Sequence, residues 1–138
     1  MMLWRRCACM LVLLVLAVAG RGTADESAFP FGHELIHEGW PVRGKKTMPM
    51  IQIEEGGLTT IDLFCGHVRA QSSVGEDGTI AIRTVSRDET RCDPQIIEGD
   101  ADLLDMLEHL TNWRRNGDIV EFSGPGTDNQ LRYYLMSN

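Results

Sequence analysis

Residues 50–85, MIQIEEGGLTTIDLFCGHVRAQSSVGEDGTIAIRTV, decide the fold, because short runs of β-branched and apolar residues alternate there with turn residues. Such runs predict strands at about 50–53, 58–64, 67–74 and 79–85. Gly56-Gly57 and Asp77-Gly78 mark turns between them, and Asp-Gly is typical of a type I′ hairpin. The stretch therefore predicts paired strands, with Ile80 and Ile82 on one face of the last.

One amphipathic helix is predicted farther along the chain, near residues 101–115. Apolar residues recur there at helical spacing, chiefly Leu103, Leu107 and Leu110. We expect Asp100 to cap the start of this helix, because Asp is a favoured capping residue. Arg114 and Arg115 would lie in its last turn, and Asn116-Gly117-Asp118 would end it.

Two more strands are predicted after the helix, at 119–123 and 130–135, with the loop 124–129 between them. Alternation in the second places Leu131, Tyr133 and Leu135 on one face and Tyr134 on the other. The order of strands, one helix and two strands predicts an α+β fold. We expect a single small domain with a curved, mostly antiparallel sheet, or partial barrel, and one main helix.

The first 24 residues have the pattern of a secretory signal peptide. Arg5 and Arg6 form a basic start, residues 7–19 are an apolar run, and small residues lead to Ala24. The apolar run is about 13 residues long, whereas a membrane-spanning helix needs about 20. We therefore expect cleavage after Ala24 and a periplasmic or secreted protein that keeps no stable membrane span.

Removal of residues 1–24 from the 138 would leave 114, enough for one domain. We expect residues 25–45 to form a lead-in whose order the sequence leaves open, and 46–138 to form the domain. The leader holds three arginines and no acid, so the net charge of −7 would become −10. This charge disfavours nucleic acid as a partner. The expected partner is an unknown protein or small ligand of the cell envelope, and the oligomeric state stays open.

Cys65 and Cys92 are the two cysteines that would remain after cleavage. In an oxidising compartment two cysteines most simply pair with each other. Such a disulfide would close a loop of about 28 residues and stabilise the folded protein by about 3–4 kcal/mol. Two free thiols or a redox pair are the alternatives, although the chain has no Cys-x-x-Cys. We predict a structural disulfide between Cys65 and Cys92.

The segment His33-Glu34-Leu35-Ile36-His37 matches His-Glu-x-x-His. On a helix this pattern lets both histidines bind zinc while the glutamate acts as general base. Gly39 and Pro41 follow closely, which leaves room for barely two helical turns. The region downstream has the pattern of strands and offers no clear third ligand. We therefore predict no catalytic residue, no metal and no cofactor, and keep a zinc hydrolase using His33, Glu34 and His37 as a low-ranked alternative.

Several short features follow one another in a fixed order after residue 49. They are Phe64-Cys65-Gly66 at a strand end, the Asp77-Gly78 hairpin, Thr90-Arg91-Cys92, the helix from Asp102 and the terminal strands. In this order they resemble the META domain family, which has HslJ-like heat-shock members, over about 90 residues. Gly66 and Arg91 depart from that family's pattern. The resemblance implies an envelope or secreted fold with Cys65 and Cys92 as neighbours, and no established catalytic residues.

The sequence thus predicts a non-catalytic periplasmic or secreted META/HslJ-like domain that serves as an envelope accessory or binding module. An alternative is an interaction protein that inhibits an exported enzyme. For that alternative, the loop 124–129 and the acidic surface would supply the contact.

Overall fold

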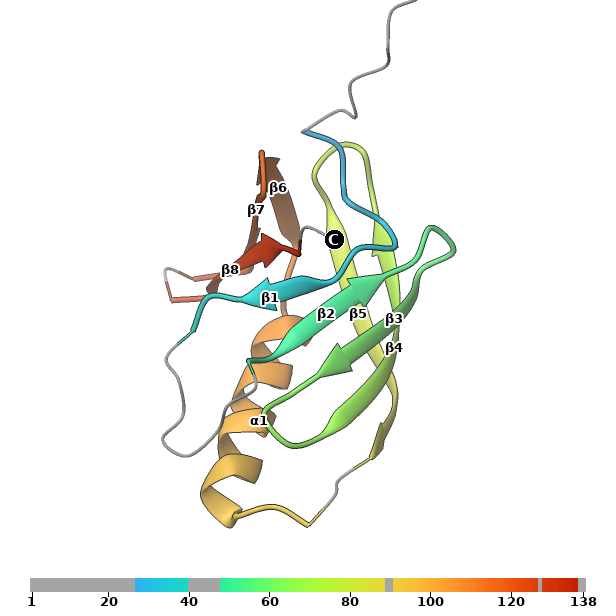
Figure 1. The fold of residues 1–138 in the computed structure, drawn as a ribbon. Coiled ribbons are helices and arrows are strands. Elements are labelled where there is room, and N and C mark those ends of the chain that lie inside the picture. The colour runs from blue at the N-terminus through green and yellow to red at the C-terminus, as the bar shows by residue number, and fades with distance from the viewer. Residues whose placement is uncertain (1–26, 40–47, 89–90, 127, 137–138) are drawn as a thin grey trace, which may run out of the picture.

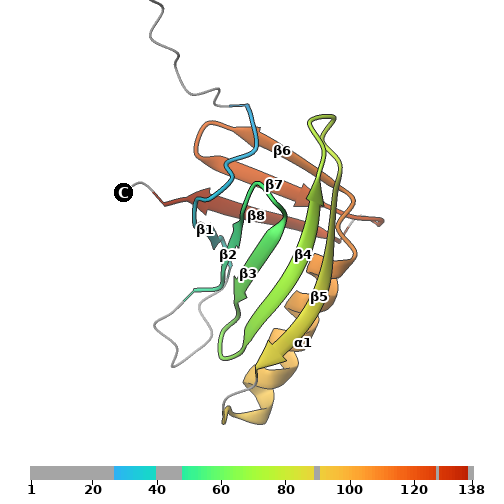
Figure 2. The same ribbon diagram turned by 90° about the vertical axis from the view of Figure 1, so that its right-hand side faces the viewer.

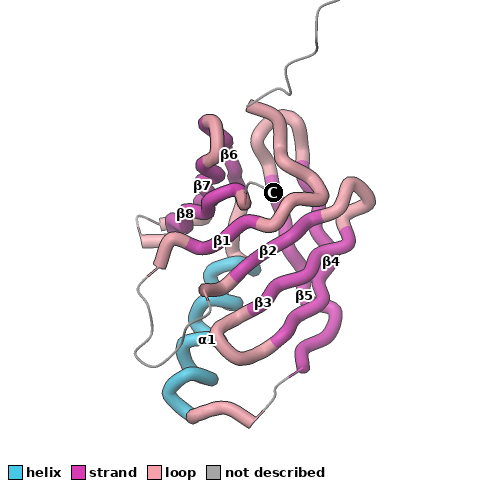
Figure 3. Tube along the Cα trace, in the orientation of Figure 1, coloured by secondary structure: helices cyan, strands magenta, loops and turns pink. Residues whose placement is uncertain are grey.

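The computed structural model describes residues 27–39, 48–88, 91–126 and 128–136 (Figure 1). The predicted signal peptide and its cleavage site lie outside these residues. Within them no helix has the length and apolar character needed to cross a membrane. The elements are β1 (Leu35–His37), β2 (Met50–Ile53), β3 (Leu58–Asp62), β4 (His67–Val74), β5 (Ile80–Asp88), α1 (Pro94–Glu108), β6 (Asn112–Asn116), β7 (Ile119–Ser123) and β8 (Gln130–Leu135) (Figure 3).

The strands form one antiparallel sheet in the order β5-β4-β3-β2-β1-β8-β7-β6. The sheet curls, so that its edge strands β5 and β6 meet near the start of β5 (Figure 2). There the Ile80 amide donates to the Thr111 carbonyl at 3.0 Å, and the Trp113 amide donates to the Gly78 carbonyl at 2.8 Å. The helix α1 lies beside the far part of β5 (Figure 2). The prediction of a small α+β domain with a curved antiparallel sheet is confirmed.

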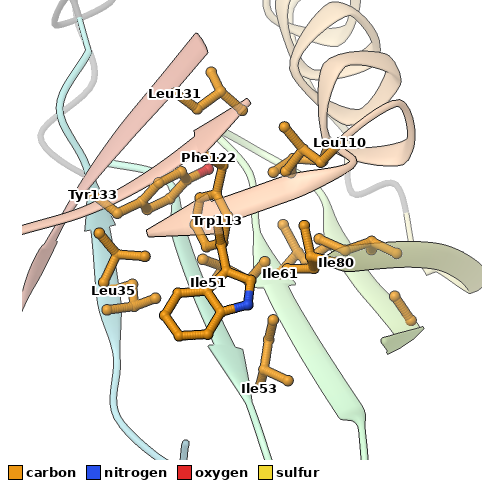
Figure 4. Packing of buried hydrophobic residues seen from close by; sticks show 14 of the residues in the cluster. Leu35, Ile51, Ile53, Ile61, Ile80, Leu110, Trp113, Phe122, Leu131 and Tyr133 are labelled. Carbon is orange, nitrogen blue, oxygen red and sulfur yellow. The ribbon is translucent and has the colours of Figure 1, made fainter. Parts of the chain in front are cut away.

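The core fills the concave side of this half-barrel (Figure 4). Alternate residues of the strands point into it, which is the period expected of a sheet with one buried face. Ile80 and Ile82 are both buried, so they lie on one face of β5, as predicted. The helix adds Leu103, Leu104 and Leu107 to the same cluster, and burial of each leucine stabilises the fold by about 1.5–3 kcal/mol.

The helix does not span the predicted residues 101–115. It begins two residues after Cys92, at Pro94, and the Asp93 side chain caps it by accepting a hydrogen bond from the Gln95 amide at 3.0 Å. Proline suits the first helical position because it has no amide hydrogen to satisfy there. The helix ends at Glu108, and the expected stop around Gly117 is instead the turn of the β6–β7 hairpin, with φ of 62° at Gly117. Arg114 and Arg115 therefore lie on β6.

The predicted lead-in supplies a strand in the middle of the sheet. β1 pairs with β2 on one side and with β8 on the other. Leu35 stands opposite both Ile51 and Leu135, and its side chain is 1% exposed. Phe29 also belongs to the core cluster. The domain therefore begins before residue 46, the boundary that the sequence predicted.

The Asp77-Gly78 pair lies in the β4–β5 hairpin, as predicted, but not in a type I′ turn. Gly78 has φ of 86°, whereas no residue other than glycine has a positive φ in the described part of the chain. A type I′ turn needs positive φ at both central residues. The loop is longer, since the Gly75 amide donates to the Thr79 carbonyl at 2.9 Å.

Candidate functional site

The His-Glu-x-x-His segment is not helical. His33 lies in a bend, Glu34 follows it, and His37 is the last residue of β1. Residues four apart along extended chain are separated by about 13 Å, so this backbone does not place the two histidines on one helical face. The described ranges also contain no group of three His, Cys, Asp or Glu side chains that could hold a metal ion. The geometry on which the zinc hydrolase alternative depends is missing from this segment.

His37 has a structural environment instead. Its ring packs edge-on against the buried Tyr133, with ring centroids 5.1 Å apart. The Nδ1 atom is buried and has no hydrogen-bond partner among the described residues. Burial lowers the pKa of His37 below 6.5, and the nearby Glu38 charge opposes this only in part. Burial also raises the pKa of the Tyr133 hydroxyl. Both rings are therefore uncharged at neutral pH, with Tyr133 buried in the core and His37 half-buried beside it.

This environment predicts a loss of stability in mild acid. Because the folded chain disfavours the imidazolium, the contribution of His37 is complete above its ordinary pKa of 6.5 and is lost as the pH falls below that value. Urea unfolding followed from pH 7.5 to 5 should therefore show a shallower loss in His37→Gln than in the wild type. His33→Gln is the control, because His33 is exposed on the same segment. Equal slopes for wild type and His37→Gln would contradict this account.

Asp100 is a buried carboxylate that joins α1 to the β3–β4 turn. Its side chain is only 1% exposed and lies inside the helix rather than at its start, so the predicted capping role is wrong. Oδ1 accepts a hydrogen bond from the Phe64 amide at 2.7 Å. Oδ2 accepts bonds from the Cys65 amide at 3.0 Å and the Gly66 amide at 2.9 Å. The carboxylate thus satisfies three consecutive amides of the turn.

The two cysteines join the same turn to the start of the helix. Cys65 lies in the β3–β4 turn, and Cys92 directly precedes the Asp93 cap. Their Cα atoms are 6.2 Å apart, within the range of disulfides, and the structure pairs them. Asp100 and the cysteine pair therefore hold one turn at two neighbouring points. This cluster stabilises the fold and presents no open site.

A row of charged side chains crosses the convex face of the sheet. Arg114 on β6 pairs with Glu121 on β7, and Glu121 lies 3.5 Å from Arg132 on β8. Arg132 reaches Glu38 at 3.2 Å, and the Tyr134 hydroxyl donates to Glu38 at 2.6 Å. A shallow groove of about 480 Å³ runs along Arg114, Glu121 and Arg132. Because these charges pair with one another in solvent, the row adds little stability and leaves few unpaired groups for a ligand.

An aromatic pocket lies where the two edges of the sheet meet. We call it the mouth pocket, and its volume is about 430 Å³. The Phe29 ring stands edge-on to Trp113, with centroids 5.1 Å apart, and lies 4.9 Å from the Phe31 ring. Figure 4 shows Trp113 among the labelled side chains of the core. The described residues that line the mouth pocket are Ser27, Ala28, Phe29, Phe31, Val74, Gly75, Glu76 and Trp113.

Hydrogen bonds fix the walls of the mouth pocket. The Trp113 indole nitrogen donates to the Gly75 carbonyl at 3.0 Å, which ties β6 to the β4–β5 hairpin. Arg115 donates through Nη1 to the Ala28 carbonyl at 3.0 Å and through Nε to the Gly117 carbonyl at 2.7 Å. The N-terminal segment is thereby held against β6. Three separate parts of the chain meet in a site that the sequence did not predict.

Comparison with known proteins yields a likeness in fold. No family model matches the chain, and no curated protein matches it. A DUF4847 family protein from Bacteroides vulgatus is similar with a TM-score of 0.52 and 9% identity, over 62% of this chain and 57% of that one. This chain thus spans less than two thirds of the length of the DUF4847 protein. A protein solved by NMR is similar with a TM-score of 0.54 and 19% identity, over 75% of this chain and 88% of the other. At these identities, the chain shares with both structures a fold, and the likeness carries no activity with it.

Proposed function

We propose that this protein is a non-catalytic binding module of the periplasm or the extracellular space that holds an apolar part of its ligand in the mouth pocket. The observation that carries the proposal is the pocket itself. Its volume of about 430 Å³ lies within the roughly 300–1,000 Å³ of typical ligand sites, and three aromatic rings line it. Aromatic rings provide much apolar contact area at little cost in side-chain entropy.

The pocket is also built to stay in one shape. Phe29 is buried in the core, and Trp113 is anchored by its indole hydrogen bond to Gly75. A site whose walls are already ordered loses less conformational entropy when it binds a ligand. The mouth pocket therefore suits binding better than a loop that must first fold around its target.

Export is part of the same proposal. The leader has the pattern of a signal peptide, and the geometry of Cys65 and Cys92 fits a disulfide, which persists mainly in oxidising compartments. The resemblance to the META/HslJ-like family points to the envelope as well. An envelope binding module is the function that agrees with these features and with the pocket.

A neutral fluorescent probe tests the pocket. N-phenyl-1-naphthylamine fluoresces strongly when it enters an apolar site, and we expect saturable binding to the wild type. Phe31→Ala should weaken binding about tenfold or more, because tenfold corresponds to about 1.4 kcal/mol and a buried phenyl group contributes at least that much. Phe31 suits the test because its side chain is half-buried, at the edge of the core rather than within it.

The matched control is Val85→Ala. Val85 lies on β5 outside the pocket lining, and its side chain is 70% exposed. The Val85→Ala variant should bind the probe with the same affinity as the wild type. Equal affinity of Phe31→Ala and Val85→Ala would place the binding elsewhere, and absence of saturable binding to the wild type would overturn the proposed function.

A further inference from the structure

We infer that the ligand of the mouth pocket is a small organic cation, in which apolar carbon surrounds or adjoins a positively charged nitrogen. This inference rests on the proposed function and names its ligand class. It follows from Glu76, the one charged side chain that lines the pocket among the residues that the structure describes, and from the rings beside it.

Glu76 supplies the charge. It lies at the exposed tip of the β4–β5 hairpin and lines the pocket. Among the described residues its carboxylate has no hydrogen bond or ion pair. The neighbouring Asp77 is used differently, since Thr79 donates to it from its amide at 3.2 Å and from its hydroxyl at 2.6 Å. The hairpin therefore presents an unpaired carboxylate at the pocket and keeps a second negative charge next to it.

The aromatic rings favour the same ligand. The faces of aromatic rings attract cations within about 6 Å, and tryptophan does so most strongly. Phe29, Phe31 and Trp113 lie close together, with neighbouring centroids 4.9 and 5.1 Å apart. Rings combined with a carboxylate form the kind of cage that recognises alkylammonium groups. A purely apolar ligand would leave Glu76 partly desolvated without a partner, which is unfavourable.

The positive charge of Arg115 is used in the pocket wall, where its guanidinium donates to the carbonyl of Ala28. Arg115 is not itself among the residues that line the pocket, and its guanidinium also donates to the carbonyl of Gly117. The net charge of the whole chain is −7, which attracts cations from solution. Glu76 and the net negative charge would both repel an anionic ligand. The electrostatics around the pocket therefore agree with a cation.

The test compares two molecules of nearly equal shape. Choline carries a quaternary ammonium group, and 3,3-dimethylbutan-1-ol has a neutral carbon in its place. In titrations of the ¹⁵N-labelled protein, we expect choline to shift the Trp113 indole signal with an affinity at least fivefold above that of the alcohol. Trp113→Phe assigns that signal by its disappearance.

A second experiment removes the charge of the Glu76 carboxylate. Glu76→Gln should weaken choline binding about fivefold and leave binding of the alcohol unchanged. Glu55→Gln, at another exposed turn, should leave both unchanged. If the wild type binds both molecules equally, or if Glu76→Gln does not discriminate, the cation inference is overturned. In that case saturable binding of the naphthylamine would still support the apolar pocket, whereas failure of all three molecules would remove the proposed function as well.

Discussion

Replacement of Asp100 by alanine is expected to lower the free energy of unfolding by about 3–5 kcal/mol. The carboxylate accepts hydrogen bonds from the amides of Phe64, Cys65 and Gly66. Each buried donor left without an acceptor costs about 1–3 kcal/mol, so the loss of three acceptor contacts sums to several kcal/mol. Urea unfolding monitored by circular dichroism measures the change as a lower midpoint.

Asp102→Ala is the matched control, because Asp102 lies two residues away on the same helix with an exposed side chain. Such a surface change should stay within about 0.5 kcal/mol of the wild type. Asp100→Asn keeps one acceptor oxygen and should fall between wild type and alanine, and it remains measurable if the alanine variant does not fold. Equal midpoints for the two alanine variants would show that the carboxylate does not hold the turn.

Loss of the Cys65–Cys92 pair should have an effect of similar size. The double variant Cys65→Ser, Cys92→Ser is expected to be about 3–4 kcal/mol less stable. The bridge joins two residues that are 27 apart in sequence, and it thereby lowers the conformational entropy of the unfolded chain. Serine keeps the size of the side chain, so the change reports mainly on the bridge. Thermal unfolding without reductant gives the difference directly.

Reduction supplies the control for this experiment. Dithiothreitol should lower the midpoint of the wild type to near that of the double variant and should leave the double variant unchanged. If dithiothreitol does not change the unfolding midpoint of the wild type, Cys65 and Cys92 are not bridged. In that event the export proposal would lose one of its supports, while the mouth pocket would remain unaffected.

The strands were predictable because their information is local. A sheet with one buried face requires apolar residues at every second position, and the chain supplies them. Tyr133 and Tyr134 illustrate this, since their side chains are 1% and 39% exposed on opposite faces of β8. The Asp77-Gly78 turn was found in the same way, although its loop type was not. Alternation therefore predicted most of the sheet before any long-range contact was known.

The helix was misplaced because two local signals were ambiguous. The leucine spacing fits a helix that begins at 94 as well as one that begins at 101, and Gly117 can end a helix or turn a hairpin. The decisive signal was Asp93-Pro94, a capping residue followed by a proline at the first helical position. A helix of 15 residues that begins at Pro94 ends before Trp113, which leaves Trp113 to the following strand.

The mouth pocket and the role of Asp100 depend on contacts between distant residues. Asp100 meets amides 34–36 residues earlier in the chain, and no nearby pattern indicates this. The pocket joins the segment around Phe29 to Trp113 on β6. The sequence treated the first of these as a lead-in and the second as part of a helix. Such a site can be recognised only after the fold has brought its parts together.

The position of β1 between β2 and β8 has a consequence for the order of folding. A strand of three residues near the start of the chain is completed by the last strand, Gln130–Leu135. When the chain is synthesised from its N-terminus, β1 lacks its β8 neighbour until almost every residue has been made. Pairings of such high sequence separation form slowly. We therefore expect the growing chain to remain incompletely folded and then to fold in one late, cooperative step.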